Sequence, residues 1–400
     1  MMDQIYYMDY LQLFSTCKET QLDGRYIHLD HIEPLLEQLA ERFAVSVIGR
    51  SVEDKPIYRV DAGHGPTKLL LWSQMHGNES TATKALCDLF KLLSDESEIA
   101  AKLLGSFTFC IIPILNPDGA QRYTRENAAG VDLNRDFTDL SQPESRALVA
   151  ARVEFEPNYC YNLHDQRTIF GVDDSGKPAT ISFLAPAYNQ ERDWNEPRTQ
   201  AASVIVNMNE VLQQYIPNCI GRFDDSFNIN CAGDSFQASG CPTILIEAGH
   251  YPNDYKREET RKYFFIALVS GFYAINENVV VSNKIADYLS IPPNKALFYD
   301  FVFKNVRINY DGNEIITNFA TQYNEQLRGD RIIFQSVIAV VGSLKGFFGH
   351  EVIDVGQDLY QDENDNQPII GEYANFTLGR VKFINSVPEK KGEKQNKNIL

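Results

Sequence analysis

The stretch KLLLWSQMHGNESTATKALCDLFKLL, residues 68–93, decides the fold. It begins with an apolar run and ends with apolar residues at helical spacing, and a histidine and a glutamate three residues apart lie between them. A continuous apolar run is typical of a strand buried on both faces, whereas the later spacing predicts an amphipathic helix. A strand over 68–75, a helix over 81–93 and another apolar strand within 105–119 predict a doubly wound α/β sheet.

The alternation of strands and helices continues along the chain. A stretch of alternating apolar and polar residues, 45–63, precedes the opening strand and predicts a hairpin. The later helices and strands are expected, in turn, over 145–155, 159–166, 199–216, 242–250 and 260–275. One open sheet covered by helices is therefore expected up to about residue 276.

The pattern changes near residue 290 to short alternating segments divided by Gly and Asp turns, which indicates a small β domain. A single core rarely grows beyond about 250–300 residues, so two domains are expected in this chain of 400 residues. Their predicted limits are 1–285 for the α/β domain and 290–387 for the β domain. The lysine-rich end, 388–400, is expected to be disordered.

Charge and cysteine content argue against several classes of protein. Lys plus Arg number 37 against 54 Asp plus Glu, a net charge of -17, so neither nucleic acid nor an anionic membrane is an expected partner. The first residues lack the features of a secretory signal, and no apolar segment reaches about 18 residues, which predicts a cytoplasmic location. The seven cysteines are scattered without a CxxC pair and indicate reduced packing residues, with Cys231 and Cys241 the only close pair in sequence. The sequence does not indicate an oligomeric state.

Three residues at strand ends have the chemistry of metal ligands. His76 and Glu79 follow the strand over 68–75, and His164 ends the later strand over 159–166. Zinc takes about three protein ligands of these types and leaves one position open when it activates water. Open α/β sheets bind ligands at the carboxyl ends of their strands. An HxxE pair alone is a weak signal, and its significance depends on the motifs that accompany it.

Two further segments supply charged residues to the same edge of the sheet. NPDG, residues 116–119, is followed by TRENAAGVDLNRDF, residues 124–137, which carries several polar residues in one loop. The loop residues with this chemistry are Arg125, Asp132, Asn134 and Arg135. Glu247 ends the apolar strand of TILIEAGH, where a carboxylate is costly unless it lines a cleft or is paired.

The order HxxE, NPDG, RxN, DLNR, a strand-end histidine and a strand-end glutamate resembles the zinc carboxypeptidase family over residues 45–276. The resemblance implies a doubly wound mixed sheet of that family's type, to which the β domain expected from the later pattern is appended. It also implies one zinc ion held by His76, Glu79 and His164, with water in the fourth position. Asp132 matches the carboxylate that orients the first zinc histidine.

The resemblance also implies roles for the remaining residues. Glu247 matches the general base, and Arg125 matches the residue that polarises the scissile carbonyl. Asn134 and Arg135 match the pair that holds the terminal carboxylate of the substrate. Apart from the resemblance, Arg167 beside His164 is expected either to add a second anion contact or to form an ion pair with Asp165 or another acid. The expected reaction is hydrolysis of the C-terminal peptide bond of a peptide with a free carboxylate.

The chain departs from the family pattern in ways that leave alternatives open. Asn78 stands before the glutamate ligand, as in the bacterial branch, and the segment around 221–230 lacks the tyrosine that caps the substrate, for which Tyr251 is one candidate. HGNE, DLNR and LHD also resemble the succinylglutamate desuccinylase and aspartoacylase relatives, whose substrates are N-acyl amino acids. NPDG and RxN favour a carboxypeptidase, and a catalytically silent binding module is the third alternative.

Overall fold

The computed structural model describes residues 8–277, 284–363 and 367–389 and divides the chain into two compact units. The first unit comprises Met1–Gln166 and Ala179–Asn294, and the second comprises Arg167–Pro178 and Lys295–Leu400. The sequence patterns did not indicate that the segment 167–178 belongs to the second unit. Among the described residues, no helix combines the length and the apolar character needed to cross a membrane.

The first unit is built on an eight-stranded mixed sheet with the order β1-β2-β4-β3-β5-β9-β7-β8. β3, β4, β5 and β9 form the parallel centre, whereas β1, β2 and β7 join through antiparallel pairings. The strands are β1 (Ala44–Arg50), β2 (Pro56–Gly63), β3 (Thr67–Trp72), β4 (Phe107–Ile112), β5 (Tyr159–Asp165), β7 (Ile181–Leu184), β8 (Ile220–Arg222) and β9 (Thr243–Ala248). The predicted mixed α/β sheet is therefore confirmed.

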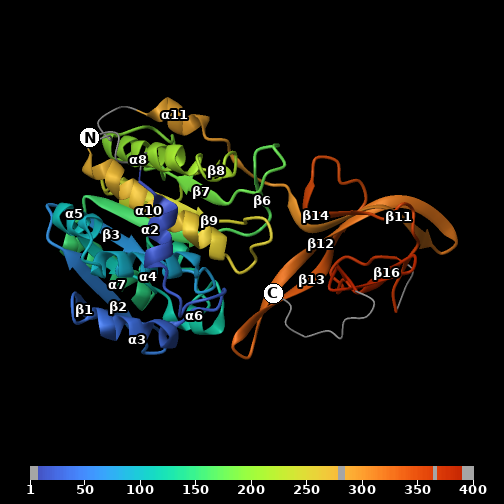
Figure 1. The fold of residues 1–400 in the computed structure, drawn as a ribbon, viewed down its shortest axis with the longest axis horizontal. Helices are drawn as coiled ribbons and strands as arrows, with labels where there is room; N and C mark the ends of the chain where they lie inside the picture. The colour runs from blue at the N-terminus through green and yellow to red at the C-terminus, as the bar shows by residue number, and fades with distance from the viewer. Residues whose placement is uncertain (1–7, 278–283, 364–366, 390–400) are drawn as a thin grey trace. The chain divides into compact units, whose positions relative to one another are not determined.

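Helices lie on both faces of this sheet (Figure 1). Alternate residues of β3 explain the arrangement, because Leu69 and Leu71 belong to one hydrophobic core and Leu70 and Trp72 to another. The helices are α2 (Tyr10–Cys17), α3 (Leu29–Leu39), α4 (Thr81–Ser94), α5 (Glu98–Ser106), α6 (Pro117–Arg122), α7 (Pro143–Phe155), α8 (Glu196–Leu212), α9 (Ala232–Ala238), α10 (Glu258–Asn276) and α11 (Ile285–Ser290). A short 3-10 turn, η1, spans Leu133–Arg135.

The second unit contains two four-stranded sheets, with the orders β13-β12-β11-β14 and β15-β16-β17-β18. Its longest strands are much longer than the short segments expected from the sequence. A register shift between Phe303 and Val306, with Asn305 at a φ of 55°, lets β11 continue through a local irregularity. The strands are β6 (Phe170–Val172), β11 (Phe298–Tyr310), β12 (Asn313–Arg328), β13 (Arg331–Val341), β14 (Phe348–Asp354), β15 (Tyr360–Gln361), β16 (Phe376–Leu378), β17 (Val381–Ile384) and β18 (Val387–Pro388), with β10 (Asn294–Ala296) at its start. Residues 390–400 of the predicted disordered tail lie outside the described residues.

Candidate metal centre and active site

The loop between β3 and α4 carries His76 and Glu79, both buried. Gly77 is needed here because a Cβ on it would lie 2.0 Å from the carbonyl carbon of Gly119. Asn116 supports the same loop: its side-chain amide donates to the carbonyl of Met75 at 3.2 Å, and its oxygen accepts from the backbone of Gly119 at 2.8 Å. The HGNE and NPDG motifs therefore pack against each other and fix the position of His76.

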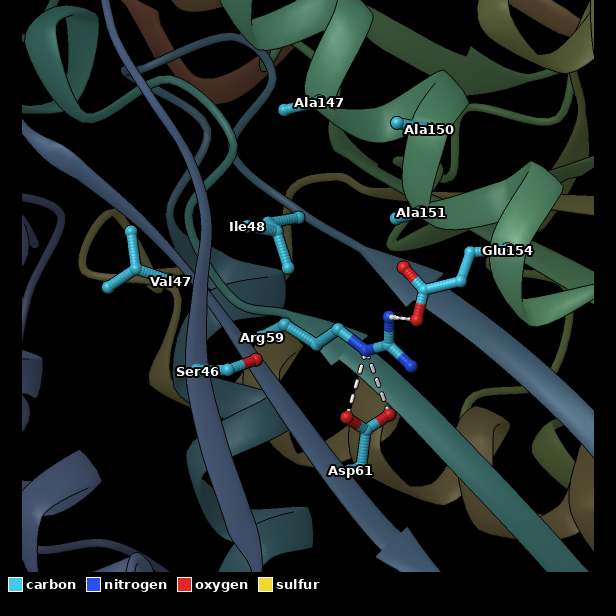
Figure 2. A pocket seen from close by; sticks show the side chains of 9 residues that line it. All are labelled: Ser46, Val47, Ile48, Arg59, Asp61, Ala147, Ala150, Ala151 and Glu154. Carbon is cyan, nitrogen blue, oxygen red and sulfur yellow. Dashed lines mark hydrogen bonds and ion pairs between the residues drawn. The ribbon is translucent and has the colours of Figure 1, made fainter.

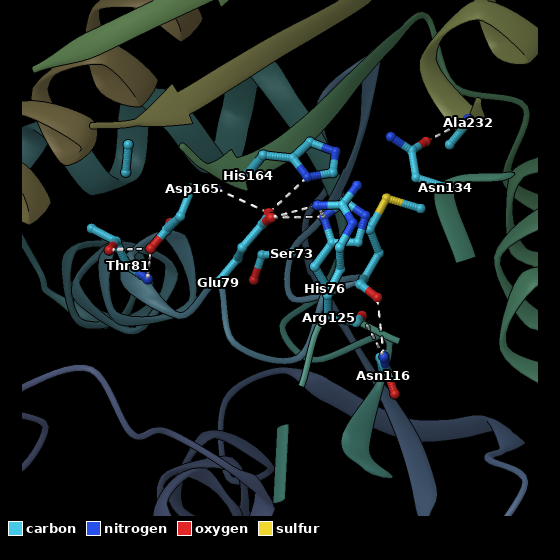
Figure 3. A network of polar contacts seen from close by, with 12 residues as sticks. Ser73, His76, Glu79, Thr81, Asn116, Arg125, Asn134, His164, Asp165 and Ala232 are labelled. Carbon is cyan, nitrogen blue, oxygen red and sulfur yellow. Dashed lines mark hydrogen bonds and ion pairs between the residues drawn. The ribbon is translucent and has the colours of Figure 1, made fainter. Parts of the chain in front are cut away.

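Three side chains converge where β3 and β5 end (Figure 3). Nδ1 of His76 lies 2.8 Å from Oε1 of Glu79, and Nδ1 of His164 lies 2.9 Å from Oε2 of the same carboxylate. Each contact joins two atoms with lone pairs, so a proton or a metal cation must stand between them. The ligand atoms all lie within 4.8 Å of one another, and two imidazoles with one carboxylate are a donor set that zinc takes. The cluster thus fits a zinc ion.

The electrostatics of the cluster also suit a cation. Burial lowers the pKa of His164, so its imidazole is held in the neutral form that binds metal. Burial opposes ionisation of Glu79, but the charge of His76 and hydrogen bonds from both histidines outweigh it and hold the pKa of Glu79 well below its usual range. A buried anion facing two imidazole nitrogens attracts a positive charge.

Arg125 and Asp132 connect the loop after α6 to this cluster. Oδ1 of Asp132 lies 3.0 Å from Nε2 of His76, and Oδ2 accepts a hydrogen bond of 3.0 Å from Nε of Arg125. The Asp132 contact fixes the imidazole so that Nδ1 faces Glu79. Nη1 of Arg125 lies 3.3 Å from Oε1 of Glu79, so its guanidinium is held at the edge of the cluster. The structure therefore brings together two loop residues that the sequence had proposed for this site.

Glu247 lies beside the cluster because of strand pairing. β5 and β9 are parallel, and their register places His164 opposite Glu247. Burial raises the pKa of the Glu247 carboxyl well above its usual range, and the charges of Glu79 and Asp165 raise it further. Its Oε2 is buried and has no hydrogen-bond partner among the described residues. A carboxyl group in this environment is suited to exchanging a proton with a bound reactant.

Asn134 and Arg135 lie in η1, directly after Asp132. Oδ1 of Asn134 accepts a hydrogen bond of 2.9 Å from the backbone of Ala232, at the start of α9. The side chain of Arg135 is exposed, and its Nη1 donates to the carbonyl of Asn134 at 2.7 Å and to Sγ of Cys231 at 3.1 Å. Both contacts use Nη1, and within the described part of the chain no hydrogen bond engages Nη2, so this amino group is suited to binding an anion.

The roles expected for Arg167 and Tyr251 stay predictions. Arg167 is exposed and belongs to the second unit. Asp165 accepts a hydrogen bond of 2.6 Å from Thr81 and lies 3.9 Å from Arg257. Tyr251 is partly buried and packs against the main core beside Tyr263, with ring centroids 5.7 Å apart.

Sequence reasoning missed Asp165 as a residue of the site. Its backbone donates to Oε2 of Glu79 at 3.1 Å, and its side chain holds Thr81 at the first position of α4. It therefore links the end of β5 to the loop that carries Glu79. Its position next to His164 in LHD was the available signal, but the pairing with Thr81 depends on contacts between residues 84 positions apart.

A cavity of about 340 Å³ between β1, β2 and α7 is separate from this cluster (Figure 2). Arg59 lines it and forms ion pairs with Asp61 at 2.9 Å and with Glu154 at 3.3 Å. The charged side chains that line this cavity therefore form ion pairs with one another. None of the candidate site residues lines it.

A mixed α/β sheet with two histidines and a glutamate clustered at its strand ends is the arrangement of an α/β protein with a zinc-binding site. Residues 29–168 match the model of the family described as zinc carboxypeptidase, so this segment is similar to that family. The matched segment includes the three candidate ligands and the loop with Arg125 and Arg135, whereas Glu247 lies beyond it. Over the matched segment, this similarity agrees with the predicted resemblance.

Individual relatives agree with this assignment. Carboxypeptidase E of Caenorhabditis elegans is 34% identical over 154 residues, which are 32% of this chain and 32% of that protein. Carboxypeptidase 2 of Trichophyton rubrum is 31% identical over 100 residues, 24% of this chain and 19% of that protein. The chain thus matches only about a fifth to a third of the length of these curated relatives. The crystal structure of carboxypeptidase A from Helicoverpa armigera shares the fold, with a TM-score of 0.51 and 18% identity over 68% of this chain and 79% of that one.

Proposed function

We propose that this protein is a zinc-dependent metallocarboxypeptidase that hydrolyses the C-terminal peptide bond of peptides with a free carboxylate. One observation carries the proposal: His76, Glu79 and His164 converge beside Arg125, and Glu247 lies on the adjacent strand opposite His164. This arrangement supports metal binding, proton transfer and stabilisation of negative charge at one point. The names of the relatives, all carboxypeptidases, agree with it.

One zinc ion held by His76, Glu79 and His164 would supply Lewis-acid chemistry, polarising the scissile carbonyl and acidifying the attacking water. Glu247 takes the proton from that water on its unpaired Oε2 and delivers it to the nitrogen of the leaving amino acid. Its raised pKa favours holding the proton between the two transfers.

Arg125 and the η1 residues position the substrate. The guanidinium of Arg125, held by Asp132, donates hydrogen bonds to the carbonyl oxygen as negative charge develops there. Arg135 binds the terminal carboxylate, with Asn134 beside it. An N-blocked dipeptide therefore lies with its free carboxylate on η1 and its scissile carbonyl between Arg125 and the metal ligands.

The test compares three substrates on zinc-loaded and chelator-treated protein. We expect hydrolysis of an N-blocked dipeptide, much slower hydrolysis of its C-terminal amide, and restoration of activity when zinc is returned to the chelated protein. Faster hydrolysis of N-acetyl or N-succinyl amino acids than of the dipeptide would reject the carboxypeptidase assignment. Activity that survives complete zinc removal would reject the metal centre.

A further inference from the structure

Two cysteines far apart in sequence meet at the ends of β5 and β9 that are remote from the metal cluster. Sγ of Cys160 and Sγ of Cys241 lie 3.3 Å apart although the residues are 81 positions apart in the chain. The contact follows from the sheet, because the backbone of Cys160 donates to the carbonyl of Pro242 at 2.8 Å at the start of the parallel pairing. Cys231, the cysteine nearest to Cys241 in sequence, contacts Arg135 instead.

The two thiols differ in their access to solvent. Cys160 is fully buried, whereas Cys241 is 5% exposed and follows the exposed turn of residues 238–240 directly. Sγ of Cys241 also lies 3.5 Å from the carbonyl of Pro157, in a second turn at this edge of the sheet. Cys241 is therefore the less buried of the two thiols and lies beside an exposed turn, from which we expect a small oxidant to reach it before Cys160.

The surroundings make Cys241 the more acidic thiol. The hydrogen bond from Cys160 lowers the pKa of Cys241, and the nearby charge of Arg152 lowers it further, against the opposing effect of burial. Arg152 is held there by the Phe236 ring, 5.0 Å from its guanidinium, and by a hydrogen bond to Ser239. In the other cysteines with a resolved shift burial raises the pKa: Cys17, Cys87, Cys110, Cys160 and Cys231. Thiolate character and proximity to a second thiol are the properties of a redox-sensitive cysteine.

We propose that Cys160 and Cys241 form a redox-active pair that hydrogen peroxide converts to a disulfide between β5 and β9. The Cys241 thiolate attacks one peroxide oxygen, the O–O bond breaks, and Cys241 sulfenic acid and water are formed once a proton is taken up. The Cys160 sulfur then attacks the Cys241 sulfur, and the sulfenic oxygen leaves as a second water with the Cys160 proton. Two thiols are oxidised by two electrons, and one peroxide is reduced to two waters.

The disulfide would restrain the two strands that carry His164 and Glu247. It would close a long loop of the unfolded chain, and a cross-link of this kind stabilises chiefly by restricting that state. Because the sulfurs already touch, small side-chain rotations are enough to bring them to bonding distance. The pair therefore acts on the stability of the first unit, and the inference is independent of the proposed catalytic function.

The experiment treats the folded, full-length protein with hydrogen peroxide, removes the peroxide with catalase, and then alkylates all thiols after denaturation. Mass spectrometry is expected to find five alkylated cysteines out of the seven, with one peptide pair linked through Cys160 and Cys241. The melting temperature of the oxidised protein is expected to rise by several degrees and to return after dithiothreitol. Seven alkylated cysteines after treatment, or a linkage that involves any other cysteine, would overturn the proposal.

Variants assign the two roles. In Cys160→Ala the sulfenic acid of Cys241 has no second thiol to react with, so dimedone is expected to label Cys241. In Cys241→Ala all six remaining cysteines are expected to stay reduced after peroxide treatment. Cys110→Ala is the matched control, because Cys110 is also buried in a strand of this sheet, and it is expected to form the same linkage as the natural chain. Loss of the linkage in the control with folding intact would contradict the assignment. If a core substitution unfolds the chain, peptide mapping of the oxidised natural protein decides whether Cys160 and Cys241 form the disulfide.

Discussion

At the scale of single residues, the proposed mechanism requires an ionisable carboxyl group at Glu247. Its carboxyl lies on β9 opposite His164 and is not itself one of the converging ligands. Glu247→Gln keeps the size of the side chain but removes the group that exchanges a proton. We expect kcat for an N-blocked dipeptide to fall by about 10²–10⁴-fold while the zinc content stays at that of the natural protein.

Glu144→Gln is the matched control for this variant. Glu144 is a buried carboxyl whose pKa is likewise raised by burial, but it contacts Asn127 and the backbone of Val52. We expect its activity to be unchanged. Equal losses in both variants would mean that burial of an acid, and not the position of Glu247, accounts for the effect.

Arg135 gives a second prediction at this scale. Arg135→Ala removes a charge-assisted hydrogen bond to the terminal carboxylate, which is worth roughly 1.5–3 kcal/mol, so kcat/KM for the free-acid dipeptide is expected to fall roughly ten- to a hundredfold. The amidated dipeptide should be affected much less. Arg146→Ala, in which an exposed arginine that donates to Leu140 and Ser141 is removed, is the control and should leave both values unchanged.

The residues that the sequence identified share one property: each lies in a short motif. His76, Glu79 and Asp132 were recognised in this way, and contacts in the structure join all three. Asp165 and the Cys160–Cys241 pair were missed because they act through tertiary contacts, one across a strand-to-helix junction and one across neighbouring strands. Such partners are fixed by strand order, which no local motif in the chain determines.

At the scale of elements, the packing of the HGNE loop on the start of α6 controls the metal cluster. A Cβ at residue 77 would overlap the backbone of Gly119, and neither backbone segment can move without displacing His76 or Asn116. We expect Gly77→Ala to weaken zinc binding and to lower the melting temperature. Gly105→Ala, in α5 with open space around the added methyl group, should retain the zinc affinity of the natural protein, as measured by competition with a chromophoric chelator.

His350 on β14 predicts a pH dependence of the second unit. Burial lowers the pKa of this histidine to about 4 from 6.5, while its Nε2 hydrogen-bonds to the carbonyl of Thr168 at 2.8 Å. The unfolded chain takes up a proton below about pH 6.5 and the native unit does not until about pH 4, so the free energy of unfolding should fall as the pH is lowered through this range. Urea denaturation of His350→Gln is expected to show a flatter pH dependence than the natural chain; identical slopes would contradict this cause.

The sequence predicted the central elements better than the peripheral ones. Long apolar runs specified β3, β4, β5 and β9, and helical spacing specified α4, α8 and α10 between them. β7 and β8 were missed because they have only four and three residues, too few for a periodic pattern. The grouping of segment 167–178 with the second unit was not indicated by the sequence for a related reason, since the pairing of β6 with β10 joins residues far apart in sequence.

At the scale of the whole molecule, all three candidate ligands belong to the first unit. A metal that binds only the native state stabilises it by mass action, so zinc should raise the melting temperature of the first unit. Differential scanning calorimetry with zinc and with a chelator is the measurement, and we expect the transition of the second unit to keep its midpoint. A shift of both transitions by the same amount, or of neither, would contradict a zinc site confined to the first unit.

The hydrogen bond between Asn134 and the start of α9 has a consequence for selectivity. Because Oδ1 accepts from the backbone of Ala232, the orientation of the amide is fixed and only its NH₂ group can face a ligand. Arg135 likewise presents only donors. A terminal carboxylate of a peptide has only acceptors and can accept from both residues. A terminal carboxamide would place its own N–H groups against these donors, and the N–H groups would have no acceptor. On the proposed function, we therefore expect the start of α9 to influence discrimination between an acid and its amide by orienting Asn134.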